Sequence, residues 1–201
     1  MNVGPGDMAP LFRCTSVTSK HEENKEFSLE DYINKGKYVV LFFYPLDFGV
    51  IASDELMALE SKREELLQNN CQIIAISQCS VEAHQHFRTT KPAAGGVQGI
   101  QFPLLVDDRG LIAKQYGVDA TRGFSYRGYF IIDDEGMIKS RVICDLPMGI
   151  GINDMVDKVK KIQNTEEIGI KDLMDEVKKI QNAEDDEDDH DDDTAILPIL
   201  P

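Results

Sequence analysis

The side chains of this chain that are best suited to chemistry are the thiols of Cys14, Cys71, Cys79 and Cys144. A deprotonated thiol is a strong nucleophile and a good metal ligand. The spacing of these cysteines is irregular and contains no Cys-x-x-Cys pair, so it matches neither a zinc site nor the disulfide framework of a small secreted protein. The sequence therefore predicts isolated thiols, most of them packed as small buried side chains, in a reducing cytoplasm.

The segment that would position catalytic groups runs from Val39 to Glu55. Residues 38–44, YVVLFFY, form an apolar run typical of a strand that is buried on both faces. Residues 54–69 show helical spacing of leucines between charged side chains. The turn between them is the usual place for chemistry in an α/β protein, yet it holds Ala52 and no thiol, histidine or obvious base.

The remaining pattern predicts a mixed sheet flanked by helices. Further strands are expected at 71–77, in FPLLVD and in YRGYFIID and IKSRVIC, and short helices at 81–88 and in RGLIAKQYGV. The last two strands flank an Asp-Glu-Gly turn, which indicates a hairpin. Parallel crossovers that precede an antiparallel hairpin are typical of an α/β fold with helices on both faces.

Charge and hydropathy exclude several classes of function. The formal net charge is −15, and the run Glu184–Asp193 holds nine acidic residues, which leaves −6 for the rest. The lack of a basic patch argues against nucleic-acid binding, and no apolar run approaches the ~18 residues of a membrane span. His84 and His86 have no second pair of ligands at metal-binding spacing, so we expect surface residues, no metal site and no other cofactor.

Residues 151–167 and 169–185 are near-copies, identical at eleven of seventeen positions with an offset of 18. Eighteen residues are five helical turns, so each copy returns its apolar stripe to the same face. We expect two amphipathic helices, or one helix with a hinge at Gly169, the first packed on the sheet and the second in need of another partner. The predicted units are a domain at 1–165, the duplicated helix at 166–182 and a disordered acidic tail at 183–201.

From about Gly4 to Val159 the chain resembles the typical two-cysteine peroxiredoxins. The resemblance is carried by several long motifs in the order and spacing of that family: APLF, GKYVVLFFYPLDF, NNCQIIAIS, IQFPLLVDDRGLIAKQYGV and FSYRGYFIIDDEGMIKSRVICDLPMG. It implies a thioredoxin-like fold with peroxiredoxin elaborations, in agreement with the order of the predicted elements.

The resemblance also implies where the catalytic residues of the family would lie. Its signature of Pro, three residues, Thr, two residues and Cys falls on PLDFGVIA, so Pro45 is kept, Gly49 replaces the threonine and Ala52 replaces the peroxidatic cysteine. Of the two arginines around the peroxide, Arg127 is kept and Ile150 replaces the other. Ser53 follows in place of a proline, and the duplicated helix supplies no resolving cysteine.

Two functions are therefore expected to compete. The first is a catalytically silent peroxiredoxin homologue that acts as a binding, scaffold or chaperone-like protein. The second is a thiol-dependent peroxidase that reduces hydrogen peroxide and organic hydroperoxides through Cys79 or Cys144. The resemblance implies a homodimer through the strand IKSRVIC, with larger rings disfavoured by the altered turn, and the helix at 170–182 or the acidic tail is a candidate surface for a protein partner.

Overall fold

The chain forms two compact units, Met1–Val159 and Lys160–Pro201. The computed structural model describes residues 3–49, 51–120, 123–145 and 148–188, with side chains as far as residue 178. Helix α4 (Ile152–Asp188) begins in the first unit and makes up the described part of the second. Within these described ranges, no helix has both the length and the apolar character that crossing a membrane requires.

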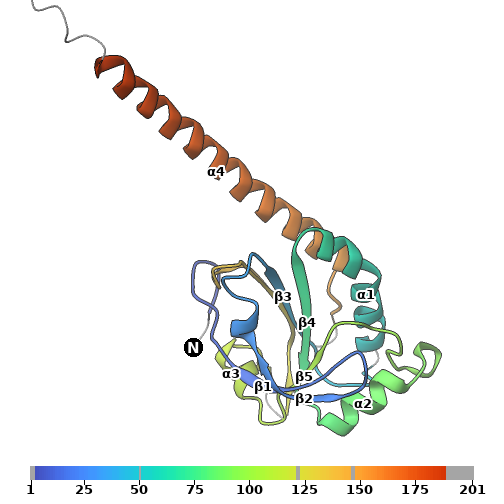
Figure 1. Ribbon diagram of the computed structural model, residues 1–201. Coiled ribbons are helices and arrows are strands. Elements are labelled where there is room, and N and C mark those ends of the chain that lie inside the picture. Colours follow the sequence, from blue (N-terminus) through green and yellow to red (C-terminus); the bar gives the residue numbers. More distant parts are fainter. Residues whose placement is uncertain (1–2, 50, 121–122, 146–147, 189–201) are drawn as a thin grey trace, which may run out of the picture. The chain divides into compact units, whose positions relative to one another are not determined.

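The centre of the first unit is a seven-stranded sheet with the order β2-β1-β5-β4-β3-β8-β9 (Figure 1). In chain order its strands are β1 (Arg13–Val17), β2 (Glu23–Ser28), β3 (Tyr38–Phe43), β4 (Cys71–Ser77), β5 (Leu104–Val106), β8 (Arg127–Ile132) and β9 (Ile138–Cys144). Strands β3, β4 and β5 run parallel, whereas β1 and β2 at one side and β8 and β9 at the other pair antiparallel. The mixed α/β sheet with a terminal hairpin is thus the one that the sequence predicts.

Strand β3 lies in the middle of the sheet because its residues are apolar on both faces. It pairs with β4 on one side and β8 on the other, and residues from Val39 to Phe43 are at most 1% exposed. A strand covered on both faces gains from a continuous apolar run rather than an alternating one. The segment that follows β3 therefore starts from one of the most rigidly packed points of the fold.

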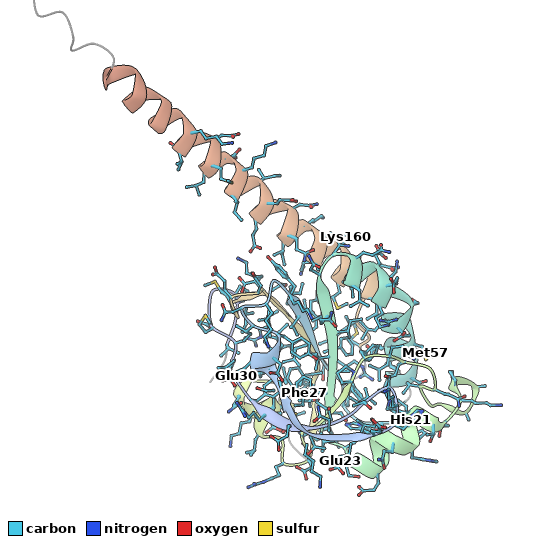
Figure 2. The ribbon with its side chains drawn as sticks, viewed as in Figure 1. His21, Glu23, Phe27, Glu30, Met57 and Lys160 are labelled. Carbon is cyan, nitrogen blue, oxygen red and sulfur yellow. The ribbon has the colours of Figure 1, made fainter. Side chains whose placement is uncertain are left out.

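Helices cover both faces of the sheet. They are α1 (Ala52–Gln68), α2 (Val81–Thr89) and α3 (Leu111–Gln115), and Figure 1 shows α1 on one side of the sheet and α3 on the other. On the α3 side, Leu41 and Phe43 belong to one cluster of buried residues with Ile112. Phe27, labelled in Figure 2, lies in the same cluster.

The structure also contains elements that the pattern does not indicate. Strands β1 and β2 are both missing from the predicted elements. Strand β2 reads ENKEFS and exposes its first four residues, so it has no apolar alternation, and its pairing with β1 accounts for it. The other small elements are the pair β6 (Asp119–Ala120) and β7 (Phe124–Ser125) and the 3₁₀ helices η1 (Leu29–Asp31) and η2 (Pro92–Ala94). Such short elements depend on tertiary pairing that local sequence does not encode.

Helix α4 is continuous through Gly169, so the structure shows neither two helices nor a break at that residue. In the first unit, the apolar stripe of the first repeat is buried: Met155 and Val159 are 0% exposed and Val156 is 2% exposed. The helical backbone continues to Asp188, into the segment predicted as an acidic tail. Residues 189–201 of that tail lie outside the described residues.

The hairpin β8–β9 depends on the absence of a side chain at Gly128. A Cβ there would lie 2.8 Å from the backbone oxygen of Val142 and 3.4 Å from Cγ1 of Ile143, both on β9. We therefore expect Gly128→Ala to lower the free energy of unfolding by about 1–3 kcal/mol, because the two strands must move apart. Urea denaturation measures this change.

Gly4→Ala is the matched control, since a Cβ at Gly4 meets nothing within 4 Å. Its unfolding free energy should stay within about 0.5 kcal/mol of the unchanged chain. Equal unfolding midpoints for the two variants would contradict the close approach of β8 and β9 at Gly128.

Candidate functional site

The candidate site lies at the first turn of α1, which begins at Ala52. The amide of Ala52 donates a hydrogen bond of 3.0 Å to the carbonyl oxygen of Gly49, and the Ala52 side chain is 0% exposed. A helix N-terminus carries a partial positive charge, which would stabilise a thiolate at this position. The side chain present is a methyl group, so this favourable field acts on no nucleophile.

Pro45 and Gly49 shape the turn that leads into α1. Pro45 is buried two residues after the end of β3, and Gly49 is half-buried. A Cβ at Gly49 would lie 3.2 Å from the carbonyl oxygen of Leu46 and 3.6 Å from Cβ of Ala52. A side chain at position 49 would thus lie against the side chain at position 52, where a threonine hydroxyl would be close to a cysteine sulfur.

Glu55 connects the other predicted site residues to this turn. Its Oε2 accepts a hydrogen bond of 2.9 Å from Nε of Arg127, and its Oε1 accepts one of 2.9 Å from the backbone amide of Ile150. Arg127 begins β8, and Ile150 precedes α4. The structure therefore brings the first turn of α1, Arg127 and Ile150 together around one carboxylate.

The sequence reasoning missed Glu55. The sequence did contain a signal for it. An acidic side chain in the first turn of a helix is stabilised by the helix dipole, and Glu55 lies one turn beyond Ala52. What the sequence does not show is that this carboxylate is buried: the side chains of Glu55 and Arg127 are each 5% exposed. At that depth the pair is compensated in charge, and loss of either member would leave a buried charge without its counter-ion.

A second buried network holds the start of the same turn. Asp47 Oδ1 accepts a hydrogen bond of 2.8 Å from the hydroxyl of Tyr44, and Asp47 Oδ2 lies 2.8 Å from Nδ1 of His84. Nε2 of His84 lies 3.0 Å from the carbonyl oxygen of Leu105. A backbone carbonyl oxygen only accepts, so Nε2 is the ring nitrogen placed to donate to Leu105, and Nδ1 is the one that faces the carboxylate.

The expectation that His84 is a surface residue is wrong, since its side chain is 0% exposed, whereas His86 is exposed as expected. His84 lies on the inner face of α2, where it joins that helix to β5 and to the turn after β3. Its role in this arrangement is to fix the backbone around Asp47. The described residues contain no group of three or more His, Cys, Asp and Glu side chains that could hold a metal ion.

The two thiols predicted as alternative nucleophiles lie in different surroundings. Sγ of Cys79 accepts a hydrogen bond of 3.2 Å from the amide of Asp47. Burial, with the nearby Asp47 carboxylate as a second cause, raises the pKa of the Cys79 thiol. Cys144 is half-buried at the end of β9 and pairs with Arg127 across the β8–β9 ladder. Cys144 is therefore the thiol next to a site residue, while Cys79 lies in a setting that disfavours its thiolate.

Removal of the charge on Glu55 tests whether the buried pair holds the site together. We expect Glu55→Gln to lower the free energy of unfolding by about 3–5 kcal/mol, because the buried charge of Arg127 loses the carboxylate that lies 2.9 Å from its Nε. Exposed Glu64 in the same helix provides the matched control, and Glu64→Gln should change stability by less than about 0.5 kcal/mol. The measurement is denaturant unfolding.

The double variant Glu55→Gln, Arg127→Met separates charge from packing. It should recover most of the loss, because no buried charge remains and the amide oxygen still accepts from Ile150. A double variant as unstable as Glu55→Gln alone would contradict the electrostatic explanation.

The shifted thiols give a prediction on pH. Burial raises the pKa of Cys14 and Cys71 to about 12 and raises that of Cys79, so each holds less thiolate at a given pH than a free cysteine. Alkylation by iodoacetamide at these three residues should therefore begin at higher pH in the folded chain than in the chain unfolded in urea. Peptide mass spectrometry across a pH series measures this, and identical profiles with and without urea would contradict the burial.

Comparison with known proteins agrees with this geometry. The model of the AhpC/TSA family matches residues 5–141. The chain is 40% identical over 162 residues to peroxiredoxin-1 of Gekko japonicus, with 80% of each chain covered. It is 37% identical over 162 residues to a thioredoxin peroxidase of Echinococcus granulosus, covering 80% of this chain and 82% of that one.

Solved structures place the same fold in the same family. The reduced 2-Cys peroxiredoxin of Plasmodium vivax matches with a TM-score of 0.79 and 30% identity, over 82% of this chain and 84% of that one. AhpC of Enterococcus faecalis matches with a TM-score of 0.75 and 30% identity, over 84% of this chain and 97% of that one. This chain, with its thioredoxin-like sheet, therefore belongs to the AhpC/TSA family and is a peroxiredoxin homologue.

Proposed function

We propose that this chain is catalytically silent as a peroxidase and acts in the cytoplasm as a binding, scaffold or chaperone-like protein. The observation that carries the proposal is Ala52, a buried methyl group at the helix N-terminus where the resemblance places the peroxidatic cysteine. The sheet around it matches that of solved peroxiredoxin structures. What it lacks is the reacting atom.

The chemistry explains why the surroundings cannot replace that atom. In a thiol peroxidase, the thiolate attacks one peroxide oxygen, the O–O bond breaks, the sulfur is oxidised to a sulfenic acid and the leaving oxygen takes a proton. Donors that hold the peroxide lower the barrier by stabilising the charge that develops on that leaving oxygen. At this site Gly49 offers no hydroxyl. Ile150 offers only its backbone amide, which already donates its hydrogen bond to the carboxylate of Glu55.

A thiol-dependent peroxidase is the second candidate, and the register of Cys144 with Arg127 favours Cys144 as its nucleophile. A nearby guanidinium stabilises a thiolate. In this structure, however, Nε of Arg127 donates to the carboxylate of Glu55, so that part of its charge is already compensated. We therefore place this function second.

A homodimer through β9 is part of the proposal. This strand ends the sheet, and five of its seven residues, Lys139 and the run from Arg141 to Cys144, are half-buried in the single chain. An edge strand of this length offers backbone groups that a second copy can pair with. Among the related structures, a Plasmodium yoelii relative modified at its N-terminus forms an octamer described as artifactual, so the size of larger assemblies stays outside the proposal.

Peroxide consumption with a thioredoxin-type reductant tests the proposal. In stopped-flow measurements, the unchanged chain should consume hydrogen peroxide no faster than the reductant does alone. Turnover that disappears in Cys144→Ser or in Cys79→Ser would show that the second candidate is right and the proposal wrong.

Restoring the missing groups gives the complementary prediction. Ala52→Cys alone should react slowly, because Gly49 and Ile150 still provide no groups for the peroxide. Ala52→Cys combined with Gly49→Thr and Ile150→Arg should react with hydrogen peroxide at least tenfold faster, measured as sulfenic acid by mass spectrometry. The same triple variant with serine at position 52 is the matched control and should form none at that position.

A further inference from the structure

The second unit carries an apolar helical face that the single chain leaves in water. Its described residues, here called the second-repeat face, are Ile170, Leu173, Met174 and Val177, which are 61%, 65%, 57% and 47% exposed. Charged side chains occupy the rest of this stretch of α4. An amphipathic helix of this kind gains stability mainly when its apolar face is covered.

The first repeat shows what such a face does when it is covered. The residues that precede the second-repeat face by 18 positions are Ile152, Met155, Val156 and Val159, and they are 8%, 0%, 2% and 0% exposed. The duplication thus reproduces a set of side chains that this protein buries elsewhere. The surface that buries the first repeat is already occupied by it, so the second repeat requires another cover.

We propose that the second-repeat face pairs, in antiparallel orientation, with the same face of a second copy of this chain. The positions 170, 173 and 177 are separated by three and four residues, and the sequence continues this spacing at position 180. Alternation of three and four is the repeat of a coiled coil. The spacing of these four positions is also symmetric about position 175. A second copy that runs in the opposite direction therefore presents the same spacing, with 173 opposite 177 and 170 opposite 180.

Charge decides the direction of this pairing. A parallel pair would bring together two runs of nine acidic residues, Glu184–Asp193, one from each copy. An antiparallel pair separates these runs, because it brings the C-terminal end of each helix α4 toward the N-terminal end of the other. Charges along facing helices select the orientation of the partner. Like charges of this density repel each other, so they oppose the parallel pair.

The length of the face sets the strength of the pair. The positions from 170 to 180 span only about three helical turns in all, so the pair has few core layers, and helices of this length associate weakly on their own. We therefore expect the two helices to dissociate on dilution. Their association becomes stronger where a second interface already holds two copies of the chain together.

Cysteine cross-linking distinguishes the orientations directly. In a Cys79→Ser, Cys144→Ser background, one chain carries Leu173→Cys and a second, of different mass through a tag, carries Val177→Cys. Mild oxidation of the mixture should give at least five times more 173–177 product than 173–173 or 177–177 product, because only opposed core positions bring the two Cα atoms within disulfide range. A homotypic excess would overturn the proposal, since it indicates parallel pairing.

The matched control uses the polar face of the same helix. Asp172→Cys and Asp175→Cys chains, mixed in the same background, should give no product above that of the reduced sample. Equal yields from the polar and apolar pairs would overturn the proposal, since they indicate random encounters.

A second measurement uses the intact cysteines. Sedimentation of the unchanged chain should show mass that rises with concentration, and Leu173→Gln with Val177→Gln should weaken this association at least tenfold while keeping helix propensity. Asp172→Gln with Asp175→Gln should not weaken it. If the variant with Leu173→Gln and Val177→Gln has the same mass as the unchanged chain at every concentration, the proposal is overturned. That result is expected if a different protein covers this face.

Discussion

The carboxylate of Glu55 is the interaction on which the candidate site depends. It joins three segments that are far apart in the sequence, because it accepts from the guanidinium of Arg127 and from the amide of Ile150 while α1 holds its backbone. A buried carboxylate of this kind is stable only with its counter-charge and its hydrogen bonds in place. The geometry of the site therefore has a structural cause that is independent of any reaction.

This structural cause does not depend on which side chain stands at position 52. Ala52 contributes a methyl group to the interior, whereas removal of Glu55 or Arg127 would take away the opposite charge that lies 2.9 Å from the other buried side chain. The Asp47–His84 pair has the same character, since both groups are buried and each hydrogen-bonds on two sides. These buried polar groups therefore contribute to stability whether or not a nucleophile stands at position 52.

The sequence predicts the central sheet well and the polar interior poorly, for one physical reason. Continuous apolar runs report burial on both faces, and so β3 and β4 are found at the expected residues. A buried polar side chain such as Glu55 or His84 reads like a surface residue until its partners are known, because those partners lie 72, 95 or 37 positions away. Strand β2 is missed for a related reason, since its pairing with β1 rather than its composition makes it a strand.

The two repeats show that burial of a whole helix face also depends on partners that the local sequence does not reveal. Val159 is 0% exposed and Val177, its counterpart, is 47% exposed, although the sequence around them is nearly the same. Local sequence therefore fixes that a helix forms and which of its faces is apolar, while what covers that face depends on what else is within reach. For the first repeat the cover is the domain itself. For the second, the reversed symmetry of the spacing and the acidic run at one end favour a second copy, because the first repeat, which has the same spacing, is already buried in its own domain.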